Sequence, residues 1–517
     1  MFEPGSNARL SAGIAVTMTK RFGVQNLLKV LAIAGCALLS ASASSMDPRL
    51  EKADKWPFGV NHGHNFSIMV EGGLLWHRQD FTWNAIEPEN GTFTFDQYDQ
   101  VVEEATGAGV RVLGILDYSA EWASSAPTTW TDGRDRAPPK NLEDWREYVY
   151  KTVDHFKGRV SHWEVWNEPN IDDFWLPEPD PLGYAKLLRE AYLAAKKADP
   201  ECTVLIGGFI GFNFNWIRQV YSYGASRYFD AMAFHPYVGE ELCFDQFNFS
   251  EKMKELKQIM SENGDADKDI WFTELAWGIG PKITREDQAN FLVRAYVLSL
   301  AEGVDRLLWF NFRGSPLEEG SGLLDHDFTR RPAFIAHANL ARLLDGAQYD
   351  SRVRIKGVEC HTFRKGDEKI LFIWVANGTR QIRMRLKSRA RQLAAQDIVG
   401  GAIHLGEDSR QIELLLSERP IIITGLTASD IRSMGRSRYG GALLGVALCV
   451  VVAIIIGAYA RMAQKRRAAV HAPVRKPLDP SLACRGTFDP DLCYRCRSYA
   501  VKGSRHFCTK KGKFLEP

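Results

Sequence analysis

Two glutamates stand at the ends of apolar runs, where a carboxylate needs an explanation. Glu168 closes the run in "HWEVWNEPN" (162–170), and Glu274 lies in "DIWFTELAW" (269–277). An ionised carboxylate does not stabilise a buried strand, because its desolvation is unfavourable unless it is paired or hydrogen-bonded. Two carboxyl groups suit glycoside hydrolysis, in which one protonates the leaving oxygen and the other attacks the anomeric carbon. A separation of about 5–5.5 Å indicates a retaining mechanism and about 6.5–9.5 Å an inverting one, and the sequence leaves both open.

Both glutamates belong to a regular alternation of predicted strands and helices. Apolar runs of strand length are separated by segments in which apolar residues recur every three or four positions and which stop at glycine. Eight such alternations predict an α/β fold, a (β/α)8 TIM barrel, with an atypical first unit because only a short link joins its first two strands. The runs are 58–62, 74–81, 111–118, 162–169, 203–208, 231–237, 269–277 and 306–312.

Polar residues gather at the carboxyl ends of these runs. In a TIM barrel these ends form the active face, so side chains from distant stretches of the chain are expected at one mouth. The fourth and seventh strands lie opposite each other, which brings Glu168 and Glu274 together. The polar residues at the run ends are His62, Arg78, Asp80, Asp117, Tyr118, Asn167, Glu168, His235, Tyr237, Glu274 and Asn311.

Four stretches carry a resemblance to known enzymes. They are "HRQDFTWNAIEPENGTFTFDQYD" near the front, "WNEPN", "AFHPY" and "WFTELAWG". Together they resemble the clan A retaining glycoside hydrolases, and most closely glycoside hydrolase family 39, including membrane-associated endoglycosidases encoded beside bacterial exopolysaccharide genes. The resemblance covers residues 57–425.

The resemblance implies roles for five of these side chains. Glu168 would be the acid/base and Glu274 the nucleophile. Asn167 would hydrogen-bond the sugar 2-hydroxyl, an interaction that strengthens in the transition state. Arg78 and Tyr237 would donate towards Glu274 and keep its pKa low, as a nucleophilic carboxylate requires. No cofactor for catalysis is implied.

Three further residues are expected around this centre. His235 would line the floor of the site, with a satisfied core histidine as the alternative. Trp309 and Trp122 would offer flat faces on which sugar rings stack. Arg78 has a structural alternative as the buried partner of Glu164 or Asp80. We expect Glu164 to be a hydrogen-bonded filler deeper in the barrel.

A smaller domain follows the barrel, which we expect over 44–349. From 350 to 426 the chain changes to short alternating runs such as "KILFIWVANG" and "PIIITG", separated by Gly, Asn and Asp turns. This pattern predicts a small antiparallel β-sandwich. Support of the barrel and independent carbohydrate binding are both open for it. Residues 427–439 form a predicted polar linker.

Two apolar segments predict export and a membrane anchor. Residues 441–460 are uncharged and about as long as a bilayer-spanning helix, so we expect one transmembrane helix over 440–460. The heavier cationic flank, beginning "RMAQKRR", follows this run and places the tail in the cytoplasm and the body outside. Residues 1–43 have the charged, apolar and small-residue order of a secretory signal. Lipidation at Cys36 and an uncleaved N-terminal anchor are alternatives.

The net charge of +2 hides a basic tail over 461–517, with 14 Lys and Arg against 4 Asp and Glu. Such a segment would be attracted to anionic lipid. Its cysteines include one C-x-x-C and could hold a structural zinc ion, with an unstructured basic tail as the alternative. No nucleic-acid recognition module is visible. The candidate zinc ligands are Cys484, Cys493, Cys496 and Cys508.

These observations predict a retaining β-glycosidase anchored in the cytoplasmic membrane, with its barrel in the periplasm or outside the cell. Its substrate would be a polysaccharide or oligosaccharide, plausibly an exopolysaccharide, and polysaccharide synthesis or export machinery is a candidate partner. Two alternatives stay open: a catalytically inactive glycan-binding or assembly protein, and a hydrolase of xylan or cellulose oligomers.

Overall fold

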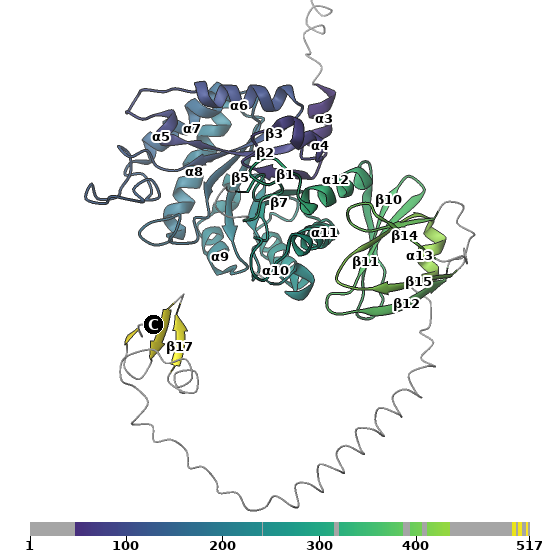
Figure 1. The fold of residues 1–517 in the computed structure, drawn as a ribbon. Helices are drawn as coiled ribbons and strands as arrows, with labels where there is room; N and C mark the ends of the chain where they lie inside the picture. Colours follow the sequence, from purple (N-terminus) through teal and green to yellow (C-terminus); the bar gives the residue numbers. More distant parts are fainter. Residues whose placement is uncertain are drawn as a thin grey trace, which may run out of the picture. The chain divides into compact units, whose positions relative to one another are not determined.

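The computed structural model describes most of the chain between residues 47 and 434, in one compact unit that contains a barrel and a sandwich (Figure 1). Near the C-terminus it describes three short antiparallel strands in a second unit, β17 (Tyr499–Lys502), β18 (Arg505–Cys508) and β19 (Lys513–Phe514). The described residues are 47–239, 241–314, 320–385, 393–405, 411–434, 499–502, 505–508 and 513–514.

Eight parallel strands close into a barrel in chain order, with β1 paired to β8, as the sequence predicts. Strand β7 is buried at every position, which explains why it appears in the sequence as a continuous apolar run. The strands are β1 (Phe58–Asn61), β2 (Trp76–Thr82), β3 (Arg111–Asp117), β4 (His162–Asn167), β5 (Thr203–Ile210), β6 (Met232–His235), β7 (Ile270–Leu275) and β8 (Arg306–Trp309).

Helices surround the barrel, and polar caps start several of them. The Asp180 side chain accepts from the Leu182 N–H ahead of Pro181, and Thr284 and Asp287 form a capping box. The first unit is atypical, as predicted, since a six-residue helix joins β1 to β2. The helices are α3 (Pro48–Asp54), α4 (Phe66–Glu71), α5 (Trp83–Ile86), α6 (Asp96–Gly107), α7 (Leu142–Phe156), α8 (Pro181–Ala198), α9 (Asn215–Ser222), η1 (Ala225–Tyr228), η2 (Phe244–Gln246), α10 (Phe249–Glu262), α11 (Arg285–Ala301) and α12 (Pro332–Leu344).

The barrel interior changes from apolar to polar along the strands. One buried apolar cluster joins residues of six strands, and it contains the rings of Trp76 and Trp271 in edge-to-face contact. Two residues further along β2 lies Arg78, and its neighbours are carboxylates and amides. Alternation along a strand puts both Trp76 and Arg78 inside. The apolar layer therefore forms the base on which the polar centre rests.

The predicted β-sandwich is present as a six-stranded sheet facing a two-stranded one, β12–β15. Alternate residues of β12 and β15 are buried and pack against β11 and β16 in one apolar cluster. The predicted linker begins with a helix, α13 (Ala428–Met434), in which Asp430 and Ile431 are buried. The remaining strands are β9 (Gln348–Arg352), β10 (Glu359–Lys365), β11 (Glu368–Trp374), β12 (Arg380–Arg385), β13 (Ala394–Gln396), β14 (Ala402–Ile403), β15 (Gln411–Leu416) and β16 (Ile421–Leu426).

The sandwich packs against α11 and α12 of the barrel through a buried ionic junction (Figure 1). Asp245 accepts hydrogen bonds from Arg294 on α11, at 3.1 and 2.5 Å, and from the indole N–H of Trp374 on β11, at 2.6 Å. Trp374 also belongs to the main apolar core of the barrel. The sandwich is therefore part of the same packed body, as a supporting domain would be.

Within the described residues, no helix combines the length and the apolar character needed to cross a membrane. The predicted signal over 1–43 and the predicted helix over 440–460 lie outside the described residues, as do Cys484, Cys493 and Cys496. The backbone of Cys508 lies in β18. The three cysteines of the body, Cys202, Cys243 and Cys360, are buried and free.

Candidate active site

Arg78 on β2 lies at the centre of the polar layer and holds four side chains. Its Nε and Nη2 donate to the two oxygens of Glu164 at 3.0 and 2.9 Å. Nη1 donates to Glu274 at 2.5 Å and to Asn61 at 2.9 Å, and Nη2 also reaches Asn167 at 3.0 Å. Arg78 therefore makes both predicted kinds of contact: it pairs with the buried carboxylate of Glu164 and it donates to Glu274.

Glu274 on β7 is kept ionised by its donors. Burial alone would raise its pKa, but His235 and Arg78, with hydrogen bonds from Tyr237 and Arg78, outweigh burial and lower the pKa below the ordinary value. The Tyr237 hydroxyl donates to Oε2 at 3.0 Å. These are the two donors expected from the resemblance, and the result is the ionised carboxylate that a nucleophile requires.

Glu168 follows β4 and contacts a different partner. Its Oε1 lies 2.7 Å from Nδ1 of His235, whose Nε2 lies 3.0 Å from the Thr273 hydroxyl. Nδ1–H of His235 can donate to Glu168, while Nε2 shares a hydrogen bond with the Thr273 hydroxyl, which also donates to Glu164 at 3.4 Å. His235 is fully buried, and a Cβ at residue 208 would lie 2.2 Å from its ring, so Gly208 makes room for it.

The backbone of β4 turns two catalytic candidates into the barrel. Strict alternation from the inward-facing Glu164 would point Trp166 inward and Asn167 outward. Trp166 instead has a φ of 69°, its ring packs outside the barrel against Trp145 and Trp175, and Asn167 reaches Arg78 inside. Glu168 also has a positive φ, 43°. Two departures from ordinary strand geometry at non-glycine residues, on either side of Asn167, are typical of functional sites.

The two carboxylates lie within catalytic range of each other. Glu168, His235 and Glu274 each offer one atom within 4.8 Å of those of the other two. This upper limit on one oxygen–oxygen distance agrees with the short carboxyl separation of retaining enzymes. The same trio is a poor cation site, because the Arg78 guanidinium binds Glu274 directly and would repel a metal ion.

The two tryptophans predicted to stack on sugar rings, Trp309 and Trp122, differ in exposure. Trp309 is fully buried, its indole N–H donates to the Ser321 carbonyl, and its ring packs near Trp277, so it has no face exposed to a sugar. The prediction that Trp309 stacks on a sugar ring therefore needs correction: its ring packs against Trp277 and against Tyr296 of α11 in the main apolar core. Phe310, the next residue, is partly exposed and meets the His62 ring edge-on. Trp122 is partly exposed, with its N–H bound to the Glu87 carbonyl.

Other residues at the mouth form a rim beside Arg78. His62 lies 3.4 Å from Asp80 across β1 and β2. Asp117 at the end of β3 is almost fully buried, and its burial, reinforced by the charge of Asp80, raises its pKa well above the ordinary value. These groups lie at the strand ends predicted for them.

Three supporting residues escaped the sequence analysis. Asn61 accepts a hydrogen bond from Arg78 and donates to backbone carbonyls of β7 and β8. The Thr273 hydroxyl is hydrogen-bonded to His235, and Gly208 leaves room for the His235 ring. Asn61 and Thr273 occupy inward positions near the ends of predicted strands, a signal that could have identified them. Nothing in the sequence marks Gly208, because its role depends on a ring from another strand.

Comparisons with known proteins agree with this geometry. The family model described as glycosyl hydrolase family 10 matches residues 67–228, which include Arg78 and Glu168 but not Glu274. The chain is similar to endo-1,4-beta-xylanase A of Phanerodontia chrysosporium, 30% identical over 140 residues, covering 26% of this chain and 33% of that protein. It is also similar to a beta-xylosidase of Geobacillus stearothermophilus, 28% identical over 143 residues, covering 26% and 28%. The match thus spans a third or less of the length of these relatives.

Solved structures match 72% of the chain. A family 39 glycoside hydrolase from Bacteroides cellulosilyticus WH2 has a TM-score of 0.61 and 22% identity, over 72% of this chain and 81% of that one. A family 39 beta-xylosidase from Caulobacter crescentus has a TM-score of 0.55 and 16% identity, over 72% and 96%. At these identities the likeness shows the fold. Together with the family model, it confirms the resemblance of this chain to the clan A glycoside hydrolases that the sequence predicts.

Proposed function

We propose that this chain is a retaining β-glycosidase that hydrolyses a β-linked polysaccharide. One observation carries the proposal: two carboxylates within 4.8 Å of each other accept different hydrogen bonds, from Arg78 and Tyr237 on Glu274 and from His235 on Glu168. Different surroundings for two acidic groups are what a division into acid and nucleophile requires.

In the first step Glu274 attacks the anomeric carbon while Glu168 gives its proton to the departing glycosidic oxygen. The bond from that carbon to the leaving oxygen breaks, and a glycosyl ester with Glu274 forms. Arg78 and Tyr237 hold the Glu274 carboxylate in place while its negative charge is lost to the new ester bond. Asn167, oriented by Arg78, is placed to bind the 2-hydroxyl.

In the second step a water molecule attacks the same carbon, and Glu168 accepts its proton. The ester bond breaks, Glu274 returns as a carboxylate, and the product keeps the β configuration. Nδ1–H of His235 stabilises Glu168 when it is deprotonated after the first step and positions it for the second. The cycle restores both carboxyl groups without a cofactor.

Two classes of substrate have support. The names of the relatives, xylanase and xylosidase, favour a xylan-type β-1,4 chain. An exopolysaccharide is favoured by the predicted display of the barrel outside the cytoplasmic membrane, with residues 440–460 as anchor and the basic tail inside. We propose the location outside the cytoplasmic membrane together with the activity. If the substrate is an exopolysaccharide, we propose polysaccharide synthesis or export machinery as the partner. The tail cysteines remain a proposed zinc site.

The test is release of reducing ends by the full chain from xylan, β-glucans and bacterial exopolysaccharides. Glu274→Gln should abolish release, whereas Glu201→Gln, an exposed glutamate before β5, should not change it. Proton NMR of the first product should show the β anomer. Binding without release by both wild type and Glu274→Gln on every glycan would contradict hydrolysis and favour a glycan-binding protein.

A further inference from the structure

The acid/base candidate Glu168 has a backbone conformation that its own sequence does not favour. Its φ is 43°, in the left-handed region that side chains other than glycine rarely adopt. It also precedes Pro169, and a proline ring favours an extended conformation for the residue before it. Backbone strain of this kind persists only where the surrounding structure holds it. Neighbouring residues therefore have to fix the turn at Glu168.

Pro169 also interrupts the backbone hydrogen bonding between β4 and β5. The two strands are paired as far as Asn167, which lies opposite Gly208, and the Glu168 N–H still donates to the Gly208 carbonyl at 3.1 Å. Pro169 has no N–H with which to continue the ladder. Backbone hydrogen bonds alone therefore leave the end of β4 weakly attached to β5 at the point where Glu168 must be placed.

The side chain of Asn170 supplies the missing contact with β5. Its Nδ2 donates to the Ile210 carbonyl at 2.9 Å, and its Oδ1 accepts from the Ile210 N–H at 3.1 Å. An amide side chain offers a donor and an acceptor together, as a backbone amide does, so it can replace the next residue of a strand. Asn170 thus adds a further pair of hydrogen bonds after the proline. We call these two hydrogen bonds to Ile210 the Asn170 clamp.

The residue that Asn170 binds on β5 also pairs with β6. Ile210 lies opposite His235 in the register of β5 and β6, and the N–H of the next residue, Gly211, donates to the His235 carbonyl at 3.0 Å. The His235 ring returns to Glu168, with 2.7 Å between Nδ1 and Oε1. These contacts close a ring in which Asn170 and Ile210 join the backbone of the acid/base to that of its histidine partner.

We propose that Asn170 is a positioning residue for general acid catalysis. It acts through Glu168: the Asn170 clamp holds the turn that presents the Glu168 carboxyl group beside His235 and towards the leaving oxygen. The nucleophile does not depend on the clamp, because Glu274 lies on β7 and is held by Arg78 and Tyr237. The catalytic role rests on the proposed function, whereas the clamp itself rests on the hydrogen bonds to Ile210.

The first test compares two substrates in Asn170→Ala and Asn170→Asp. Alanine removes both hydrogen bonds, and an ionised aspartate keeps the size of the side chain but cannot donate to the Ile210 carbonyl. Either change should lower polysaccharide hydrolysis by the full chain about 10- to 100-fold, the loss expected when a catalytic group is misplaced by about 1 Å. The first step on a dinitrophenyl glycoside, followed as a burst of dinitrophenolate, should keep its rate because that leaving group needs no proton.

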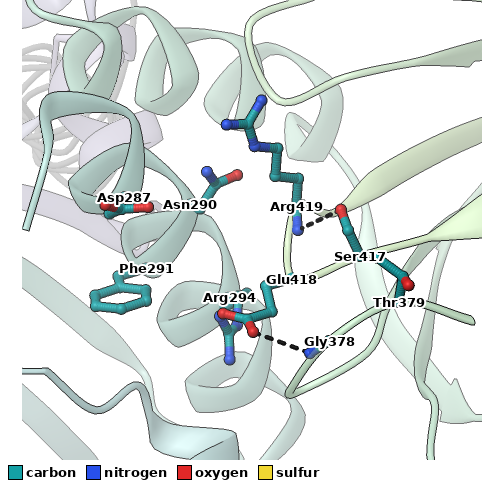
Figure 2. Close-up of a pocket in the computed structure, with 9 residues that line it drawn as sticks. All are labelled: Asp287, Asn290, Phe291, Arg294, Gly378, Thr379, Ser417, Glu418 and Arg419. Carbon is teal, nitrogen blue, oxygen red and sulfur yellow. Dashed lines mark hydrogen bonds and ion pairs between the residues drawn. The ribbon is translucent and has the colours of Figure 1, made fainter.

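Asn290→Ala is the matched control (Figure 2). Asn290 lies on α11 beside a cavity between the barrel and the sandwich, and its Nδ2 donates to the Glu286 carbonyl at 2.8 Å. The control removes a hydrogen bond of the same kind without involving any contact of Glu168, so it should change neither rate. Equal loss on both substrates in the Asn170 variants would indicate general damage to the mouth and overturn the proposal, as would unchanged polysaccharide hydrolysis.

A second test does not require turnover. Hydrogen–deuterium exchange of the full chain, followed by mass spectrometry, reports on the Ile210 N–H, whose acceptor is Asn170 Oδ1. This amide should lose its protection in Asn170→Ala and keep it in Asn290→Ala. Unchanged exchange in Asn170→Ala would overturn the clamp whatever the activity. Faster exchange in Asn170→Ala, together with a wild type that cleaves no glycan, would support the clamp and contradict the proposed function.

Discussion

Replacing Tyr237 with phenylalanine tests how Glu274 is kept ionised. The substitution removes one hydroxyl and with it the 3.0 Å hydrogen bond to Oε2, while the ring and its surroundings stay. Because that bond lowers the pKa of Glu274, its loss raises the pKa. A hydrogen bond to a charged group contributes about 1.5–3 kcal/mol, so kcat/KM should fall roughly 10- to 150-fold if the contact acts in full in the transition state.

The assay is the pH dependence of kcat/KM on the best glycan or aryl glycoside. Activity needs ionised Glu274 and is lost as the pH falls through its pKa, so the acid limb of the Tyr237→Phe profile should move to higher pH. Tyr192→Phe removes a hydroxyl that contacts Asp230 on the barrel exterior and should leave the limb in place. An acid limb that does not move in Tyr237→Phe would refute the role assigned to this hydrogen bond.

Three other substitutions test the rest of the site. Glu168→Gln should lower the rate of polysaccharide hydrolysis about 10²- to 10⁴-fold. It should spare the first step on a dinitrophenyl glycoside, because that leaving group needs no proton. Equal loss of rate on both substrates would contradict the role of Glu168 as acid. Gly208→Ala puts a Cβ 2.2 Å from the His235 ring, so it should lower the free energy of unfolding by about 1–3 kcal/mol and also lower activity. An unchanged stability in thermal or urea unfolding would show that the ring can move at no cost. Arg78→Met leaves two buried carboxylates uncompensated and should lower the free energy of unfolding in urea by about 3–5 kcal/mol. The exposed Arg189→Met should lower it by almost nothing, and equal stabilities of the two variants would count against the buried network.

The barrel was predictable because the strands are largely buried on both faces and most of the runs end in polar residues. Such strands stand out as apolar runs, and the closure of eight of them into a ring fixes which ends converge. The contacts of Glu274 with Arg78 and Tyr237 could be anticipated from the resemblance. The sandwich followed from alternation, since β12 and β15 bury every second residue.

The details that escaped depend on backbone geometry and on contacts between strands. Nothing in the residue types shows that Trp166 adopts a positive φ, yet this conformation turns Asn167 inward. Trp309 and Phe310 are both aromatic, and only the structure shows that the first packs in the core and the second lies partly exposed.

The charge balance around Arg78 explains why a deep glutamate belongs to the site. One guanidinium forms salt bridges with two carboxylates, those of Glu164 and Glu274, and therefore neutralises only one of them. The anomeric carbon gains positive charge in the transition state, and the excess negative charge is already oriented towards it and needs no reorganisation. When the ester with Glu274 forms, that excess disappears and Arg78 remains balanced by Glu164. Glu164 thus holds the Arg78 guanidinium in place and keeps it from fully neutralising the negative charge of Glu274.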